Sequence, residues 1–256
     1  MTVERIYMGS ERVTAGPIGY MMRPGGALHV VFLHGLGCAR ESFIEAFKSD
    51  WFDPTLSLLA PDLPGHGDSP RDPDYSYDLD VQAYEILELL DKLRIQRAVL
   101  VAHSIGNICG LKLARKIQEP IGYYCLEGNL IASDCQLSTR IAKYDETTFV
   151  TKFHPIAHQQ FQCPNCAERG ADPIALYRSA ASLVRHCADD LPLQQFLDLE
   201  LTKAYFYGSR NATMPVLSRF FDKVDLVEVP NAGHFVMNDA PEFVWREIAR
   251  RVASQA

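Results

Sequence analysis

Short runs of apolar residues recur along the chain, and each run contains almost no polar residue. A run of this kind is typical of a strand that is buried on both faces of a sheet. Such strands are predicted at Leu28–Leu33, Ser57–Ala60, Ala98–Ala102, Gly122–Leu126, Ala204–Tyr207 and Leu226–Val229. Ahead of them, the residues from Ile6 to Met22 predict two short antiparallel strands with a turn at Gly16–Pro17.

Apolar residues at steps of three and four predict helices between these strands. In residues 79–93, Ala83 and Ile86 begin an apolar stripe along one helical face. Further helices are predicted at Ile105–Ile117 and from Pro241, because proline suits the first turn of a helix. Alternating strands and helices predict an α/β fold, with a mostly parallel sheet and helices on both of its faces.

One segment, about Asp134–Leu199, interrupts this alternation. It is helical in character, rich in His, Gln, Cys and aromatic residues, and too long for a simple crossover between strands. We therefore predict a helical lid at residues 134–199, inserted into a core domain made of residues 1–133 and 200–256. A chain of 256 residues has room for one large α/β domain with such an insertion.

Composition narrows the class of partner and the compartment. The net charge of 25 − 32 = −7, without a Lys/Arg stripe, argues against a nucleic-acid or anionic-membrane partner. No apolar run approaches the roughly 18 residues of a membrane span, and Met1 to Gly9 lacks a signal-peptide core. Seven cysteines, an odd number, are typical of reduced thiols, which predicts a cytoplasmic protein. We expect a monomer or a homodimer that binds a small molecule.

The strongest chemical signal is a serine between a predicted strand and a predicted helix, within Val99–Gly106. A serine hydroxyl is a poor nucleophile unless it is held exposed beside a base. A tight strand-turn-helix exposes it and leaves the next backbone N–H free at a helix N-terminus. Such a turn needs small residues two positions before and after the serine, and here Ala102 and Gly106 flank Ser104. We predict Ser104 as a nucleophile, with a serine that only caps the helix as the alternative.

This junction resembles the Gly-x-Ser-x-Gly elbow of the α/β-hydrolase fold family, with Ala102 in place of the first glycine. The resemblance extends over nearly the whole chain. Residues 34–37, His-Gly-Leu-Gly, resemble the family's oxyanion loop, which implies that the N–H groups of Leu36 and Ile105 receive the developing oxyanion. Asp62–Ser69 resembles the loop after the family's fourth strand and is expected to fix a bend.

A histidine follows the last predicted strand, in the sequence Ala232-Gly233-His234-Phe235. It matches the family's histidine loop and precedes the predicted terminal helix. A neutral imidazole can take the Ser104 proton near pH 7 and return it to the leaving group. We predict His234 as the base, and a histidine of the core or surface is the alternative.

The third triad residue is open between several positions. Family members most often carry an Asp after the seventh strand, where this chain has Asn211, which can orient a histidine but cannot offset its charge. Glu127 ends the strand before it, where some members, certain haloalkane dehalogenases among them, carry their acid. A buried carboxylate at a strand end needs a partner, and an imidazolium supplies one. We predict Glu127, with Asn211, Asp134 and Asp225 as alternatives.

In the predicted lid, two histidines precede a Cys-x-x-Cys pair: His154, His158, Cys163 and Cys166. These residue types and spacings are compatible with zinc, and the cysteines with a redox disulfide. However, four ligands would have to converge from one short segment, so we predict neither a metal nor a cofactor. Phe153, Phe161 and His103 are predicted to contact the substrate.

These residues predict hydrolysis of a small-molecule ester through an acyl-enzyme, with Ser104, His234 and Glu127 as the triad. The same groups would serve thioesters and the C–C bonds of aromatic ring-cleavage products. A serine in place of an aspartate argues against dehalogenase or epoxide hydrolase chemistry. Two other functions stay open: a ligand sensor that keeps the hydrolase fold with slow turnover, and a lyase that uses the same pocket.

Overall fold

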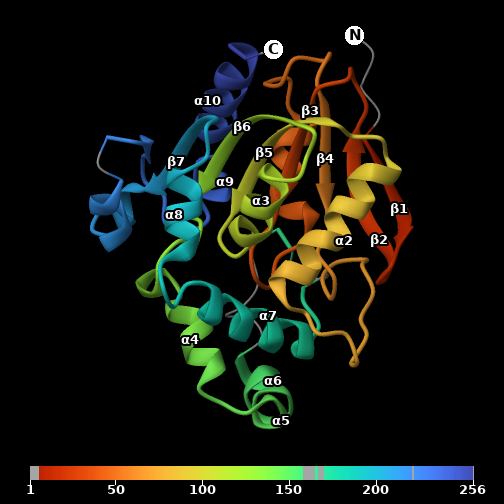
Figure 1. The fold of residues 1–256 in the computed structure, drawn as a ribbon, viewed down its shortest axis with the longest axis vertical. Helices are drawn as coiled ribbons and strands as arrows, with labels where there is room; N and C mark the ends of the chain where they lie inside the picture. Colours follow the sequence, from red (N-terminus) through yellow and green to blue (C-terminus); the bar gives the residue numbers. More distant parts are fainter. Residues whose placement is uncertain (1–5, 158–164, 167–169, 221, 256) are drawn as a thin grey trace.

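The computed structural model describes residues 6–157, 165–166, 170–220 and 222–255. Within these residues, eight strands form one sheet in the order β1-β2-β4-β3-β5-β6-β7-β8 (Figure 1). The strands are β1 (Tyr7–Val13), β2 (Gly16–Arg23), β3 (His29–Leu33), β4 (Ser57–Pro61), β5 (Arg97–His103), β6 (Glu119–Leu126), β7 (Thr202–Gly208) and β8 (Asp225–Val229). β2 pairs antiparallel with β1 and β4, and the other pairs are parallel. The predicted α/β fold with a mostly parallel sheet is confirmed.

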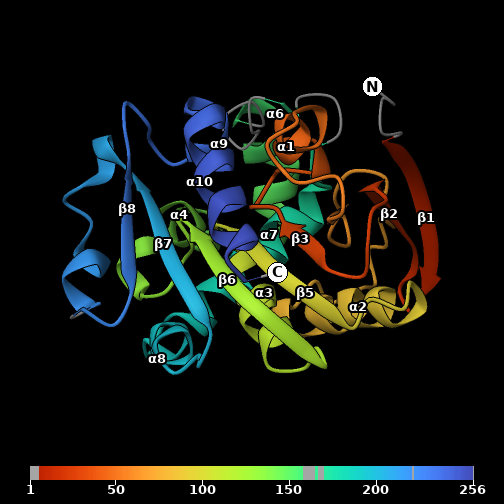
Figure 2. The same cartoon turned by 90° about the horizontal axis from the view of Figure 1, so that it is seen from above.

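Helices cover both faces of the sheet, with α2 and α3 on one side and α1, α9 and α10 on the other (Figure 2). Their bounds are α1 (Ile44–Lys48), α2 (Leu79–Lys92), α3 (Gly106–Ala114), α9 (Val236–Asp239) and α10 (Pro241–Ala253), and a 3-10 turn η1 (Arg40–Phe43) precedes α1. Leu100 and Ala102 pack into the core under α2 and α3, whereas Val99 and Val101 pack into the core under α1 and α10. Because both faces of β5 are buried, residues 98–102 of the strand are all apolar.

Between β6 and β7 the chain leaves the sheet and forms a series of helices. In the described part of this segment they are η2 (Ala132–Asp134), α4 (Gln136–Ala142), α5 (Glu146–Thr148), the π-helical turn η3 (Phe149–Phe153), α6 (His154–Ala157), α7 (Pro173–His186) and α8 (Leu191–Leu197). Helices α4 to α7 lie together beyond one end of the sheet (Figure 1), and α8 contacts α3. Two 3-10 turns, η5 (Ser209–Asn211) and η6 (Pro215–Arg219), follow β7.

The first hairpin turns two residues earlier than the sequence predicts, at Thr14–Ala15 rather than Gly16–Pro17. Two carboxylates of α2 accept hydrogen bonds from the backbone of this turn. Glu88 accepts the Thr14 N–H at 2.9 Å, and Glu85 accepts the Ala15 N–H at 2.9 Å. Gly16, at φ +119°, then begins β2. The contacts that fix this turn therefore come from residues about 70 positions away in the chain. A local sequence pattern cannot predict such contacts.

The helix predicted at Ile105–Ile117 is also shorter, because α3 ends at Ala114. The N–H groups of Lys116 and Ile117 both donate to the Leu113 carbonyl, which tightens the chain into a turn. β6 then begins at Glu119, three residues before the predicted strand.

No helix in the described ranges is long and apolar enough to cross a membrane. The cysteines that these ranges contain are all buried: Cys38, Cys109, Cys125, Cys135, Cys166 and Cys187.

The loop Asp62–Ser69 is held by a buried ion pair that the sequence did not reveal. Arg40 is 1% exposed, and its guanidinium contacts the carboxylates of Asp62 and Asp68. The Asp62 carboxylate also accepts the backbone N–H groups of Arg40 at 2.8 Å and Asp68 at 3.0 Å. This pairing supports the structural role expected for the loop.

Replacing Arg40 with methionine should leave Asp62 as a buried, uncompensated charge. We expect the free energy of unfolding to fall by about 3–5 kcal/mol. Arg246→Met is the matched control, because Arg246 forms an exposed pair with Glu242, and its loss should cost about 0.5 kcal/mol or less. Urea unfolding measures both, and equal small losses would contradict the role of Arg40.

Candidate active site

Ser104 lies at a sharp bend between β5 and α3. Its φ of +53° is in the left-handed region, where a residue with a side chain is strained. A methyl group at Gly106 would come within 2.5 Å of the His34 carbonyl oxygen, so this position requires glycine. On the other side, a Cβ at Gly110 of α3 would lie 2.5 Å from the Tyr123 hydroxyl and 3.1 Å from the Ala102 methyl, so this glycine leaves room for both side chains. The tight turn is therefore kept although its first glycine is replaced.

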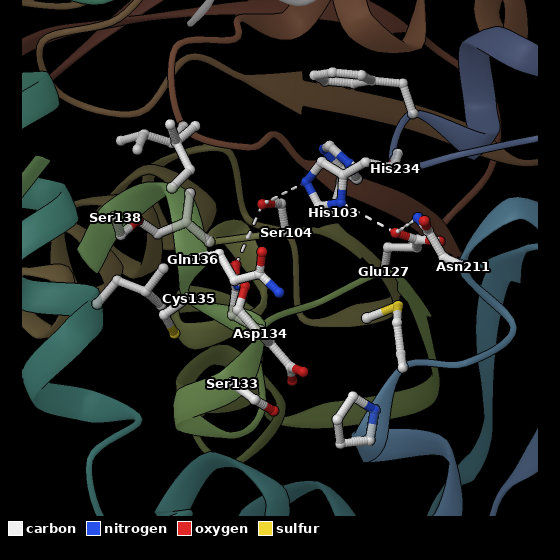
Figure 3. Close-up of a pocket in the computed structure, with 18 of the residues that line it drawn as sticks. His103, Ser104, Glu127, Ser133, Asp134, Cys135, Gln136, Ser138, Asn211 and His234 are labelled. Atoms are coloured by element: carbon white, nitrogen blue, oxygen red, sulfur yellow. Dashed lines mark hydrogen bonds and ion pairs between the residues drawn. The ribbon is translucent and has the colours of Figure 1, made fainter. Parts of the chain in front are cut away.

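Three predicted residues meet at this bend (Figure 3). The Ser104 Oγ lies 3.0 Å from Nε2 of His234, a residue 130 positions away in the chain. On the other side of the ring, Nδ1 lies 3.1 Å from Oε2 of Glu127. Because a carboxylate only accepts hydrogen bonds, Nδ1 carries the proton, and Nε2 is left to accept from the serine hydroxyl.

Glu127 is buried, with its side chain 1% exposed, and its φ is +41°. Its Oε1 accepts the Gly208 N–H at 2.8 Å and the Asn211 Nδ2 at 2.9 Å, and the same Nδ2 lies 2.8 Å from Oε2. Asn211 therefore contacts the carboxylate of Glu127, while the carboxylate contacts His234. Two residues that the sequence offered as alternatives thus belong to one hydrogen-bonded group.

The other two alternative acids have different partners. Asp134 accepts the N–H groups of Leu130 and Ile131 through Oδ2, at 3.0 and 3.1 Å. Asp225 pairs with Arg251 of α10. Among the hydrogen bonds between described residues, none joins either carboxylate to His234.

Burial raises the pKa of the Asp134 carboxyl from 3.8 to about 6, although its two N–H donors lower it. Between these values the folded protein holds a proton that the unfolded chain has released, so stability falls as the pH rises. Asp134→Asn should therefore stabilise the protein at pH 8, by about 1–3 kcal/mol, because the amide oxygen can still accept both N–H groups. The gain should vanish as the pH falls towards 4. Thermal unfolding at a series of pH values tests this, and a variant less stable at pH 8 would contradict it.

The predicted oxyanion donors flank the serine. Ile105 follows Ser104 directly at the start of α3, and Leu36 lies in the loop after β3; both line the same cavity as Ser104. That loop is tightly packed, since a Cβ at Gly35 would lie 3.1 Å from Ser104 Cβ. Among the backbone hydrogen bonds of the described loops and turns, none uses the N–H of Leu36 or Ile105 as donor.

His103, which we predicted to contact the substrate, also bonds to a neighbouring loop. It lines the cavity but is 1% exposed, and its Nε2 lies 2.9 Å from the His234 carbonyl oxygen. Since a carbonyl only accepts, His103 donates this bond and tethers the backbone of the loop that carries His234.

Of the predicted aromatic contacts and the zinc-compatible set, Phe153, His154 and Cys166 belong to the described residues. Phe153 is 38% exposed, stacks on Tyr144 and is not among the residues that line the cavity. Phe161, His158 and Cys163 lie outside the described residues. Cys166 is buried with its Sγ 3.2 Å from the Ser42 hydroxyl, and the His154 ring lies beside Phe149.

The cavity beside Ser104 has a volume of about 530 Å³ and a wall of mixed character. Apolar side chains come from the core and from the segment between β6 and β7, and include Leu36, Leu137, Leu183, Met214 and Phe235. Several polar side chains come from η2 and α4, among them Ser133, Asp134, Gln136 and Ser138 (Figure 3).

The sequence analysis missed Asn129, which also lines this cavity. It is 5% exposed, and its Oδ1 lies 3.2 Å from the Ser104 Oγ. Its position two residues after Glu127 in the same strand-end loop was the only available signal.

Comparison with known proteins gives consistent matches. The pattern described as "Alpha/beta hydrolase family" matches residues 30–247. The sn-1-specific diacylglycerol lipase ABHD11 of Mus musculus is 34% identical over 256 residues, which cover 88% of this chain and 82% of the relative. Among solved structures, the N-acyl homoserine lactonase AidH has a TM-score of 0.75 at 20% identity, and the haloalkane dehalogenase DbeA from Bradyrhizobium elkani has 0.73 at 21%. Each covers 98% of both chains, and identities this low show a shared fold alone.

Proposed function

Because the chain belongs to the alpha/beta hydrolase family, we propose that it hydrolyses a small-molecule carboxylic ester through an acyl-enzyme on Ser104. The observation that carries the proposal is the unbroken line of hydrogen bonds from Ser104 through His234 to Glu127. The name of the mouse relative gives an ester as its substrate, which also favours ester hydrolysis here.

In the first half-reaction, the Ser104 Oγ attacks the carbonyl carbon while its proton passes to Nε2 of His234. The imidazolium that forms is stabilised by the buried carboxylate of Glu127, which Gly208 and Asn211 hold in place. His234 then protonates the leaving alcohol as the C–O bond breaks. The acyl group remains on Ser104 until water removes it.

The negative charge on the carbonyl oxygen needs donors that are in place before the reaction. The N–H groups of Leu36 and Ile105 would supply them, and Ile105 stands directly before the positive end of α3. Donors of this kind typically lower the barrier by about 3–4 kcal/mol each.

Residues 134–199 act as a lid in this proposal. Support comes from Asp134, Gln136, Leu137 and Leu183, which line the cavity from this segment. A cavity of about 530 Å³ suits a ligand of small to medium size, and its mixed wall suits an ester with both an apolar and a polar part.

A panel of p-nitrophenyl esters of increasing acyl length tests the proposal. We expect continuous turnover, with kcat/KM of about 10⁴ M⁻¹ s⁻¹ or more for the best ester. The value should fall for long acyl chains, because they exceed the volume of the cavity. Release of one equivalent of p-nitrophenol without further turnover would indicate a sensor, and no release from any ester would contradict the proposal.

A further inference from the structure

The side-chain amide of Asn129 has a fixed orientation beside Ser104. Its Nδ2 lies 2.8 Å from the backbone carbonyl oxygen of Asp134. Since that carbonyl can only accept, the nitrogen must point towards Asp134 and the oxygen, Oδ1, towards Ser104. The backbone is held as well, because the Asn129 carbonyl accepts Nδ2 of Asn107 at 3.0 Å and its N–H donates to the Ser104 carbonyl at 3.3 Å.

The Ser104 hydroxyl therefore faces two acceptors with a single proton. Nε2 of His234 lies 3.0 Å from Oγ, and Oδ1 of Asn129 lies 3.2 Å from it. An acceptor beside the nucleophile does not help to stabilise an oxyanion, which needs donors. Oδ1 of Asn129 can therefore assist only in a step of the reaction at which a donor other than the serine hydroxyl is present.

Acylation creates that stage. Once Oγ is part of an ester, it has no proton, and Oδ1 of Asn129 becomes a nearly buried acceptor without its donor, which is an unfavourable state. His234, having given its proton to the leaving alcohol, again has a free lone pair on Nε2. Two acceptors that both lie about 3 Å from Oγ then face the region of the acyl carbon. A water molecule has two O–H donors that match them.

We propose that Asn129 orients the water that hydrolyses the acyl-enzyme, an inference that rests on the proposed function. One water proton bonds to Oδ1 of Asn129, and the other is taken by Nε2 of His234 as the water oxygen attacks the acyl carbon. His234 then returns that proton to Oγ as the bond between carbon and Oγ breaks. The products are the free serine and a carboxylic acid that keeps the second water proton.

Asn129→Leu tests this role, because leucine has a similar size and no acceptor. With p-nitrophenyl acetate as the probe, the deacylation rate should fall by about 10-fold, as expected for loss of one hydrogen bond between neutral groups. The acylation rate should change far less. The variant should therefore release p-nitrophenol in a burst, and intact-protein mass spectrometry should find the acetylated enzyme accumulating.

Asn129→Asp distinguishes two roles of Asn129: orienting the water, and holding the loop through its bond to the Asp134 carbonyl. It keeps an acceptor oxygen and loses the donor to the Asp134 carbonyl, so it should retain most of the deacylation rate. Equal deacylation defects in both variants, or parallel losses in acylation and deacylation, would overturn the inference, as would wild-type deacylation in Asn129→Leu. A wild-type enzyme that never carries an acyl group on Ser104 would instead mean that the proposed function itself fails.

Discussion

Replacing Ser104 with alanine is expected to lower kcat/KM for ester hydrolysis by about 10⁴- to 10⁶-fold. The methyl group cannot form the ester bond, so what remains is catalysis by the oxyanion donors and by substrate binding alone. The loss should appear with every ester that the wild-type enzyme hydrolyses. Initial rates on purified protein measure it.

The fold should survive this substitution, because alanine removes one hydroxyl and keeps the packing contacts of the turn. Ser218→Ala is a matched control, since the Ser218 hydroxyl is exposed and donates to the Pro215 carbonyl. It should keep the wild-type rate. If Ser104→Ala is slowed but clearly active, a lyase that uses the same pocket without an acyl-enzyme becomes the better explanation.

Glu127→Gln is expected to lower kcat by about 10³- to 10⁴-fold, the loss that follows when a triad acid becomes an amide. Glutamine removes the charge that stabilises the imidazolium. In addition, the Gly208 N–H donates to Oε1, the oxygen that does not contact His234, and Asn211 Nδ2 lies within hydrogen-bond distance of both oxygens. The amide therefore turns its oxygen towards the Gly208 N–H and its NH₂ towards Nδ1 of His234, which favours the wrong tautomer of the ring.

Asn211→Ala is the informative comparison. It removes one donor from Glu127 and leaves the charge and the Gly208 N–H in place, so we expect a loss of about 10-fold or less. Values of kcat for both variants, measured across a range of pH, decide between them. A larger loss in Asn211→Ala than in Glu127→Gln would move the orienting role to Asn211.

The positions of Ser104 and His234 could be predicted because local backbone geometry leaves a local signature. The bend at Ser104 requires glycine at position 106, and this glycine can be recognised directly in the sequence. The alanine at 102 was harder to interpret, because Gly110, which leaves room for its methyl group and for the Tyr123 hydroxyl, lies on the following helix.

No local sequence pattern could predict which residue contacts the His234 imidazole as the third member of the triad. Glu127 and Asn211 follow β6 and β7, which are neighbours in the sheet, so both side chains reach the same place. Which of them meets the imidazole depends on tertiary packing. The sequence likewise could not tell that Phe153 would face outwards beside Tyr144, or that Asn129 would turn its oxygen towards Ser104.

The most direct measurement is to label the protein with a fluorophosphonate and map the adduct by peptide mass spectrometry. We expect one adduct, on Ser104, formed much more slowly in His234→Ala and absent in Ser104→Ala. A protein that hydrolyses esters yet carries the adduct on another residue, or reacts equally fast without His234, would contradict the assignment of Ser104 as a nucleophile activated by His234.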